Sequence, residues 1–203
     1  MSENFWENRY AQANRIFGDE PSELLTRFRQ LFTRDMAALA VGDGEGRNSV
    51  WLAQQGLQVT AVEQSRSAVA KAKSFAEANG VHVDFQCMNL HDYAWPDAAF
   101  DLIISIFVHL PVAERERNRQ FLLKSLRPGG LVVIEGYHVD HLATGLSGPP
   151  DPHMYFTEAA VSRDYSELEP LHLQKSQTDV IENGVLLGSG LALEYIGRKR
   201  NHL

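Results

Sequence analysis

The chain contains 203 residues, of which 44% are hydrophobic, and this length suffices for one substantial core but not comfortably for two. We therefore expect a single domain over residues 1–203. The formal net charge is −7, with acidic and basic residues spread along the chain, so no cationic stripe is available for a phosphate backbone and no nucleic acid partner is expected.

Cysteine usage and hydropathy predict the compartment. Cys87 is the one cysteine and excludes an internal disulfide. The first residues lack the apolar core of a signal peptide, and no apolar run reaches membrane-spanning length. These features predict a cytoplasmic protein with no membrane partner, and the scattered histidines, which lack zinc-type spacing, predict no metal.

The hydrophobic pattern predicts a helical lead at residues 1–35, followed by alternating strands and helices. Short apolar runs bounded by turn residues are strand candidates at 37–41, 58–63, 83–88, 102–107 and 131–136. Helical spacing occurs at 49–55, 67–79 and 113–126, and Asn79-Gly80 is typical of a helix end. This alternation indicates a parallel sheet covered by helices on both faces.

The last part of the chain has a different pattern. Residues 171–180 and 186–197 flank Glu182-Asn183-Gly184, which is typical of a β-hairpin with a tight turn. Residues 137–155 contain three histidines and show no periodicity. Because long irregular connections usually serve as lids or binding loops, we predict a lid or substrate loop there.

The segment Gly42-Asp43-Gly44-Glu45-Gly46 joins the first predicted strand to a predicted helix. Alternating glycines allow positive φ and let a ligand approach the main chain, although an ordinary tight turn is the alternative. A nicotinamide or flavin dinucleotide loop would carry its third glycine where this chain has Arg47. A Walker phosphate loop is excluded because no Gly-Lys-Ser/Thr ending follows.

Two polar residues follow the next predicted strands. Glu63 closes the second strand about 20 residues after the loop, where a carboxylate suits the two hydroxyls of a ribose. Asn89 follows the third strand and can pair its amide with an adenine ring. The alternatives are a solvated strand end for Glu63 and a turn asparagine for Asn89.

Taken together, these motifs resemble the class I S-adenosylmethionine-dependent methyltransferases over nearly all of the chain. The glycine loop resembles their first motif, Glu63 the acidic end of their second strand, and Asn89-Leu90 the pair beside the adenine. Residues 100–105 are similar to their fourth strand and residues 126–131 to the turn before their fifth. The segments that look most like the small tellurite-resistance and thiopurine methyltransferase branch are 5–10, 46–48 and 106–111.

Two positions depart from the pattern of these methyltransferases. Ala40 stands where an acidic residue is common, two positions before the first glycine, and Asn89 replaces a frequent aspartate. The resemblance implies a Rossmann-like, doubly wound sheet of seven strands, mostly parallel, with a C-terminal antiparallel hairpin.

The resemblance also implies a function. The cofactor would be S-adenosylmethionine and the acceptor a small molecule, with a soft sulfur, selenium or tellurium nucleophile implied by the branch. A non-catalytic module that binds S-adenosylmethionine and a nicotinamide-dependent oxidoreductase are the alternatives. We expect a monomer or a homodimer.

The residues predicted to bind the cofactor are Tyr10, Gly42, Asp43, Gly44, Gly46, Arg47, Asn48, Glu63, Gln64, Asn89, Leu90 and Ser105. Trp6 and Tyr10, four positions apart, could form an aromatic wall over the sulfonium or simply pack an amphipathic helix. His109 follows the fourth strand and is the catalytic candidate, as a proton acceptor or an anion-binding donor. The alternative for His109 is a structural hydrogen-bonding residue.

Several of these residues have a second interpretation. Arg47 lies in a first helical turn, where the macrodipole disfavours a cation, so an anion should lie near it: either Glu45 or the carboxylate of a ligand. Asn48 could cap the helix or contact the ligand. Gln64 could be a plain turn residue, and Ser105 could leave room for the cofactor or bond to backbone in the core.

Overall fold

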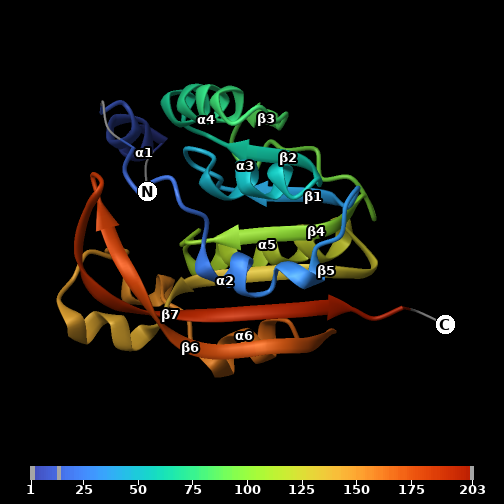
Figure 1. Ribbon diagram of the computed structural model, residues 1–203. Helices are drawn as coiled ribbons and strands as arrows, with labels where there is room; N and C mark the ends of the chain where they lie inside the picture. Colours follow the sequence, from blue (N-terminus) through green and yellow to red (C-terminus); the bar gives the residue numbers. More distant parts are fainter. Residues whose placement is uncertain (1–2, 13–14, 202–203) are drawn as a thin grey trace. The chain divides into compact units, whose positions relative to one another are not determined.

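The computed structural model describes residues 3–12 and 15–201. Seven strands form one sheet in the order β3-β2-β1-β4-β5-β7-β6 (Figure 1). The strands are β1 (Ala37–Val41), β2 (Gln58–Glu63), β3 (Asp84–Cys87), β4 (Phe100–Ile106), β5 (Leu126–Tyr137), β6 (Leu168–Glu182) and β7 (Val185–Lys199). The helices are α1 (Glu3–Tyr10), α2 (Glu23–Arg27), α3 (Arg47–Gln54), α4 (Arg66–Ala78), α5 (Val112–Ser125) and α6 (Glu158–Asp164), with 3-10 turns η1 (Arg29–Leu31), η2 (Val139–Thr144) and η3 (Pro152–Met154).

This sheet confirms the predicted fold class, a mostly parallel seven-stranded sheet with antiparallel strands at its C-terminal end. The chain also divides into two compact units. The first comprises residues 1–94 with 182–185, and the second comprises residues 95–181 with 186–203. The single domain over 1–203 stays a prediction.

In the first unit, β1 pairs with β2 and β2 with β3, both in parallel. Helix α3 packs against β1 and β2, and α4 packs against β2 and β3. Helix α4 begins at Ser65, whose hydroxyl accepts from the Ala68 amide, and ends at Asn79, after which Gly80 has φ +67°. The predicted stop at Asn79-Gly80 is therefore confirmed.

The second unit contains the parallel pair β4–β5 and the antiparallel pair β5–β7. Strand β5 starts five residues before its predicted start at residue 131. Its pairing with β4 shifts register, because Phe100 lies opposite Leu126 and Leu102 lies opposite Leu131. The predicted turn at 126–131 is thus a bulge inside the strand, and Gly129 provides the positive φ of +77° that it needs.

The predicted hairpin is confirmed and is longer than expected. Asn183 and Gly184 connect β6 to β7 with φ values of +52° and +74°, as a two-residue turn with both central residues left-handed requires. The turn belongs to the first unit, where the Gly184 amide donates to the Ile16 carbonyl over 3.1 Å. Arg9 of α1 forms an ion pair of 3.0 Å with Glu182.

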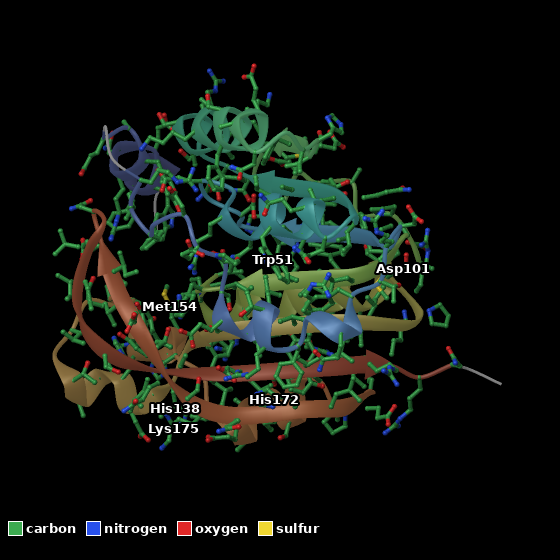
Figure 2. The ribbon with its side chains drawn as sticks, viewed as in Figure 1. Trp51, Asp101, His138, Met154, His172 and Lys175 are labelled. Atoms are coloured by element: carbon green, nitrogen blue, oxygen red, sulfur yellow. The ribbon has the colours of Figure 1, made fainter. Side chains whose placement is uncertain are left out.

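Residues 137–155 are more regular than predicted, because they contain η2 and η3. His138 and His141 are buried, and the His138 ring is hydrogen-bonded at both nitrogens, to the Asp140 amide and the Glu158 carboxylate. Lys175, labelled beside His138 in Figure 2, extends this network by pairing with Asp140. A lid or substrate role for the segment stays a prediction.

Helix α6 was not predicted from the hydrophobic pattern because it is only seven residues long. Its start did carry a signal, since Thr157 caps the Ala160 amide and Glu158 lies in the first turn. Within residues 3–12 and 15–201, no helix has the length and apolar character needed to cross a membrane.

Candidate functional site

The glycine loop at residues 42–46 leaves β1 and enters α3, and all three glycines have positive φ: +58°, +62° and +86°. A Cβ added to Gly44 would lie 2.7 Å from the Tyr10 hydroxyl oxygen. A side chain at Gly44 would therefore be strained and would collide with its neighbour. The absence of a side chain at Gly44 lets the Tyr10 hydroxyl lie close to the main chain of the loop.

Glu63, at the end of β2, holds this loop. Its Oε2 accepts a hydrogen bond of 2.9 Å from the Gly44 amide, and its Oε1 accepts one of 2.9 Å from the Ser65 amide. Burial raises the pKa of this carboxyl group above its usual value, and the backbone donors oppose that rise. Each carboxylate oxygen has a second lone pair, so the ribose contact predicted for Glu63 remains compatible with this geometry.

Asp43 is the second carboxyl group of the loop. Its Oδ2 accepts a hydrogen bond from the Ser49 hydroxyl, while its Oδ1 is buried and has no hydrogen-bond partner. Burial raises the pKa of Asp43 to about 7, and the nearby Glu63 carboxylate contributes to the rise. The loop thus contains a buried carboxylate oxygen that no group of the protein satisfies.

Helix α1 supplies Tyr10, whose ring is buried next to Gly44. Trp6 stacks on Tyr10 with centroids 5.6 Å apart, and both rings pack with Ile16 and Ala68 in one apolar cluster. This packing supports the amphipathic-helix interpretation of the Trp6–Tyr10 pair, and a contact with the sulfonium stays a prediction. Burial raises the pKa of Tyr10, as does the nearby Glu63 carboxylate, so its hydroxyl stays protonated.

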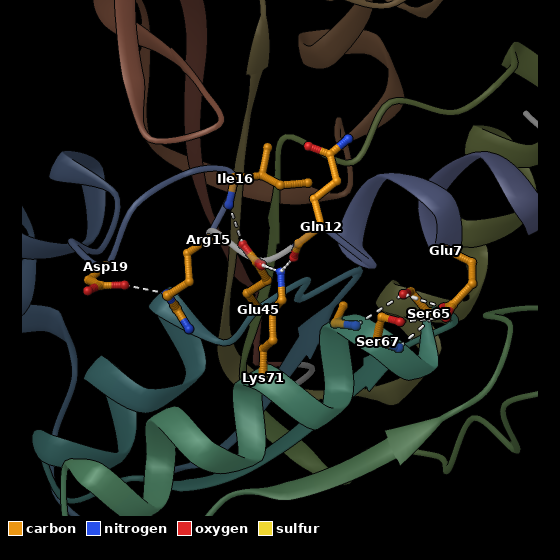
Figure 3. Close-up of polar contacts among 10 residues, drawn as sticks. Glu7, Gln12, Arg15, Ile16, Asp19, Glu45, Ser65, Ser67 and Lys71 are labelled. Atoms are coloured by element: carbon orange, nitrogen blue, oxygen red, sulfur yellow. Dashed lines mark hydrogen bonds and ion pairs between the residues drawn. The ribbon is translucent and has the colours of Figure 1, made fainter.

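Glu7 fastens α1 to the start of α4 (Figure 3). Its carboxylate accepts hydrogen bonds from the Ser65 hydroxyl at 2.7 Å, the Ser67 hydroxyl at 2.6 Å and the Ser67 amide at 3.3 Å. These bonds lower the pKa of Glu7 below its ordinary value, with Ser67 as the largest cause. The carboxylate form, which is needed for all three bonds, is therefore favoured.

Glu45 forms a second link to the lead, also drawn in Figure 3. This buried carboxylate accepts from the Ile16 amide at 2.7 Å and from Lys71 at 2.9 Å, and Lys71 also donates to the Gln12 carbonyl. Arg47 donates to the Glu20 carbonyl over 3.1 Å. Lys71 and the Ile16 amide thus bind the two Glu45 oxygens, and the anion expected near Arg47, either Glu45 or the carboxylate of a ligand, stays a prediction.

Asn48 does not cap α3. Gly46, in the left-handed conformation, occupies the N-cap position, and Asn48 lies inside the first turn. The buried Asn48 side chain accepts a hydrogen bond of 2.9 Å from the Ser22 amide at the start of α2. Asn48 therefore connects α3 to the helical lead, and its contact with a ligand stays a prediction.

Gln64, Asn89 and Leu90 lie together at the carboxyl ends of β2 and β3. The Asn89 Nδ2 lies 3.4 Å from the Gln64 Oε1, and the Asn89 Oδ1 accepts from the His91 amide over 3.0 Å. The second contact is the turn interaction anticipated as the alternative for Asn89. Asn89 and Leu90 are half-buried, so adenine recognition by this edge stays a prediction.

In the second unit, Ser105 and His109 lie at the carboxyl end of β4. Ser105 is half-buried in the strand, opposite Ile134 of β5. Phe107, one residue past the strand, has φ +55°, a costly conformation for a non-glycine residue. The His109 Nδ1 lies 3.1 Å from the Phe107 carbonyl and helps to hold this turn.

Both ring nitrogens of His109 have backbone partners. The Tyr137 amide donates to Nε2 over 2.9 Å, so Nε2 is the acceptor and Nδ1–H donates to the Phe107 carbonyl. Burial lowers the pKa of His109 to about 4, which keeps the ring neutral at pH 7. Its neighbours are the rings of Phe107, Tyr137, Tyr155 and Phe156. The arrangement favours the structural alternative for His109 over a proton acceptor.

We expect His109 to make the protein sensitive to acid. Its folded-state pKa of about 4 lies below the ordinary 6.5, so the unfolded chain takes up the proton first and stability falls as pH drops from 6.5 toward 4. Between pH 7 and pH 4 this one group should cost about 3 kcal/mol. Urea unfolding at several pH values checks this, and His109→Gln should flatten the loss; an equally steep loss in His109→Gln would contradict the assignment.

The sequence interpretation gave no role to Glu7, Ser49 and Lys71 of the first unit, and it treated Ser65 only as a turn residue or a cofactor contact. Each acts through a partner that the sequence does not place beside it, as Glu7 does with Ser65, 58 positions away. Ser65 alone carried a signal, because a serine before a helical pattern is a common N-cap. No group of three or more His, Cys, Asp or Glu side chains suited to a metal ion occurs in the described part of the chain.

Comparison with known proteins gives a family match for part of the chain. Residues 38–130 match the family described as "Methyltransferase domain". A curated relative, a ubiquinone biosynthesis O-methyltransferase of Rhizobium leguminosarum bv. trifolii, is 30% identical over 99 residues, which are 49% of this chain and 39% of the relative. The chain therefore spans less than half the length of that relative.

Solved structures share the fold at low sequence identity. A structure titled "Conversion of a Disulfide Bond into a Thioacetal Group during Echinomycin Biosynthesis" has a TM-score of 0.78 at 18% identity and covers 98% of this chain and 92% of its own. The N-methyltransferase NodS of Bradyrhizobium japonicum, in complex with S-adenosylhomocysteine, has a TM-score of 0.74 at 16% identity, covering 98% of both chains.

One of several similar solved structures bears on the predicted branch of the methyltransferases. TehB of Haemophilus influenzae has a TM-score of 0.70 at 19% identity and covers 98% of this chain and 67% of its own. Because it is one of several, membership of that branch stays a prediction. Together the comparisons show the class I methyltransferase fold and a match of residues 38–130 to a methyltransferase domain.

Proposed function

We propose that the protein transfers a methyl group from S-adenosylmethionine to a small-molecule acceptor. Residues 38–130 carry the match to the methyltransferase domain, and the glycine loop lies within that range. The observation that carries the proposal is the buried Asp43 oxygen in the glycine loop, which has no hydrogen-bond partner among the described residues. A polar ligand at this loop would supply the missing hydrogen bond.

The charges around the loop fit a cationic ligand. Asp43, Glu45 and Glu63 all act electrostatically on Tyr10, which lies against Gly44. S-adenosylmethionine carries a positive sulfonium, whereas a dinucleotide would bring an anionic pyrophosphate toward these carboxylates. This charge pattern favours the sulfonium cofactor over the nicotinamide alternative.

The side chains have separate tasks in this proposal. The bound cofactor supplies an activated methyl group. The chain has to bind the cofactor, align it with the acceptor and exclude water. Glu63 accepts from the ribose hydroxyls while it holds Gly44, and Asn89 with Gln64 faces the adenine. Tyr10 and the lead cover the loop, with Glu7 and Glu45 as their anchors.

His109 supports a proposal for the class of the acceptor. Because both of its nitrogens are hydrogen-bonded to backbone groups, His109 serves as a positioning residue and provides no base. An acceptor that needs little proton removal suits such a site, and the resemblance to the tellurite and thiopurine branch indicates a soft sulfur, selenium or tellurium nucleophile. We further propose a cytoplasmic monomer or homodimer that does not act on nucleic acid.

Calorimetric titration tests the proposal. We expect micromolar binding of S-adenosylmethionine and S-adenosylhomocysteine, no binding of NAD, and methyl transfer to members of a panel of thiols, selenols, phenols and amines. Binding without transfer to any acceptor would favour the non-catalytic module. Binding of NAD in place of the sulfur compounds would overturn the assignment.

A further inference from the structure

The two oxygens of the Asp43 carboxyl group, in the first unit, differ in their hydrogen bonding. Oδ2 is fixed by the Ser49 hydroxyl, while Oδ1 is buried and has no donor. A buried acceptor without a partner costs on the order of 1 to 3 kcal/mol. Such a cost is typical of a group that is kept for a ligand.

The groups around Asp43 indicate the charge of the missing partner. Glu63, at the end of β2, acts as a like charge, and Arg47 of α3 is a weaker opposing charge. Tyr10 of α1 is neutral, and the Lys71 ammonium is engaged by Glu45 and the Gln12 carbonyl. The pocket around Oδ1 is therefore short of positive charge, and a cationic donor would relieve both the repulsion and the missing hydrogen bond.

Position 40 provides no second acidic group for such a ligand. Ala40 on β1 is buried and offers no carboxylate toward the loop. Asp43, three residues after Ala40, is the first acidic residue of the loop. The Ser49 hydroxyl fixes the orientation of its side chain.

We propose that Asp43 binds the α-ammonium group of the cofactor through Oδ1, with Ser49 as the residue that positions it. This role rests on the proposed function, because it assumes a sulfonium amino acid at the loop. Asp43 then selects a cationic ligand, whereas Glu63 recognises the neutral ribose. The two carboxylates of the loop have separate tasks.

Three ligands separate the possible contacts. S-adenosylmethionine carries the ammonium and the sulfonium, S-adenosylhomocysteine carries only the ammonium, and 5′-deoxy-5′-methylthioadenosine carries neither. We expect Asp43→Asn to raise the dissociation constant of the charged ligands at least tenfold and that of methylthioadenosine less than twofold. Weakening of both charged ligands is the result expected for a contact with the ammonium, and weakening of S-adenosylmethionine alone would overturn the proposal.

Proton release gives a readout that does not depend on activity. The free protein holds Asp43 partly protonated near pH 7, and a cation at Oδ1 would drive that proton off. Titration in buffers of different ionisation enthalpy should show release of about half a proton per S-adenosylmethionine at pH 7, and no such release in Asp43→Asn. Undiminished release in the variant would overturn the proposal.

Controls distinguish this inference from a general loss of the site. The matched variant is Asp84→Asn, an exposed aspartate at the start of β3, which should bind all three ligands as the wild type does. If Asp43→Asn fails to fold, Ser49→Ala should still weaken the charged ligands several-fold and spare methylthioadenosine. Equal weakening of all three ligands, or none, contradicts the role of Asp43, whereas failure of the wild type to bind any of them contradicts the proposed function itself.

Discussion

Replacing Gly46 by alanine should lower the free energy of unfolding by about 3 kcal/mol. The new Cβ would lie 2.9 Å from the Ala72 Cβ and 3.2 Å from the Ala72 Cα, so relief requires a shift of α4 itself. The left-handed conformation of Gly46, with φ +86°, adds backbone strain for any L side chain. Thermal unfolding should show a fall in melting temperature of roughly 10 °C.

Gly80→Ala is the matched control for this prediction. Gly80 has a similar φ of +67°, but a Cβ there would meet no atom within 4 Å. Only the backbone strain remains, so the expected loss is about 1 kcal/mol. If both substitutions cost the same, the close approach of the loop to α4 contributes nothing and the explanation for Gly46 is wrong.

Glu63→Ala should weaken binding of S-adenosylmethionine by roughly a hundredfold, because hydrogen bonds to a charged acceptor contribute about 1.5 to 3 kcal/mol each. The substitution also leaves the Gly44 and Ser65 amides without their acceptor, so the loop loses its support. Calorimetry with purified, folded protein measures the effect. An affinity within threefold of the wild type would remove Glu63 from the binding site.

Two further variants interpret that result. Glu77→Ala removes an exposed glutamate from α4 and should leave binding unchanged. Glu63→Gln should not restore binding, because its amide nitrogen would face one of the two backbone donors, Gly44 or Ser65. A glutamine that binds as well as the wild type would show that the negative charge and the second acceptor oxygen are both dispensable.

The parallel strands were the most predictable part of the fold. The predicted bounds of β1 and β2 agree with the structure because both strands are short apolar runs between turn residues, the pattern of a doubly covered parallel strand. The hairpin was equally predictable, because Asn183-Gly184 is suited to two positive φ values. Two of the boundaries that differed, the start of β5 and the end of β4, lie where a bulge in β5 or the left-handed Phe107 interrupts a strand.

The candidate site was less predictable than the fold. The glycine loop and Glu63 were evident from spacing, and the structure brings them together through the Gly44 amide. The partners of Glu45, Asn48 and His109 were not evident, because each is fixed by a group 26 or more positions away in the sequence. A single sequence predicts which residue types lie at an edge of the sheet. It does not predict which backbone amides donate hydrogen bonds to their side chains.

The position of the hairpin turn constrains when the lead can become ordered during synthesis. Arg9 pairs with Glu182, and the Ile16 carbonyl accepts from the Gly184 amide. Glu182 is made 173 residues after Arg9, so it emerges from the ribosome long after its partner. A nascent chain therefore lacks these two contacts of its lead until residues 182 and 184 have been made, and a polypeptide interrupted before residue 182 cannot form them at all.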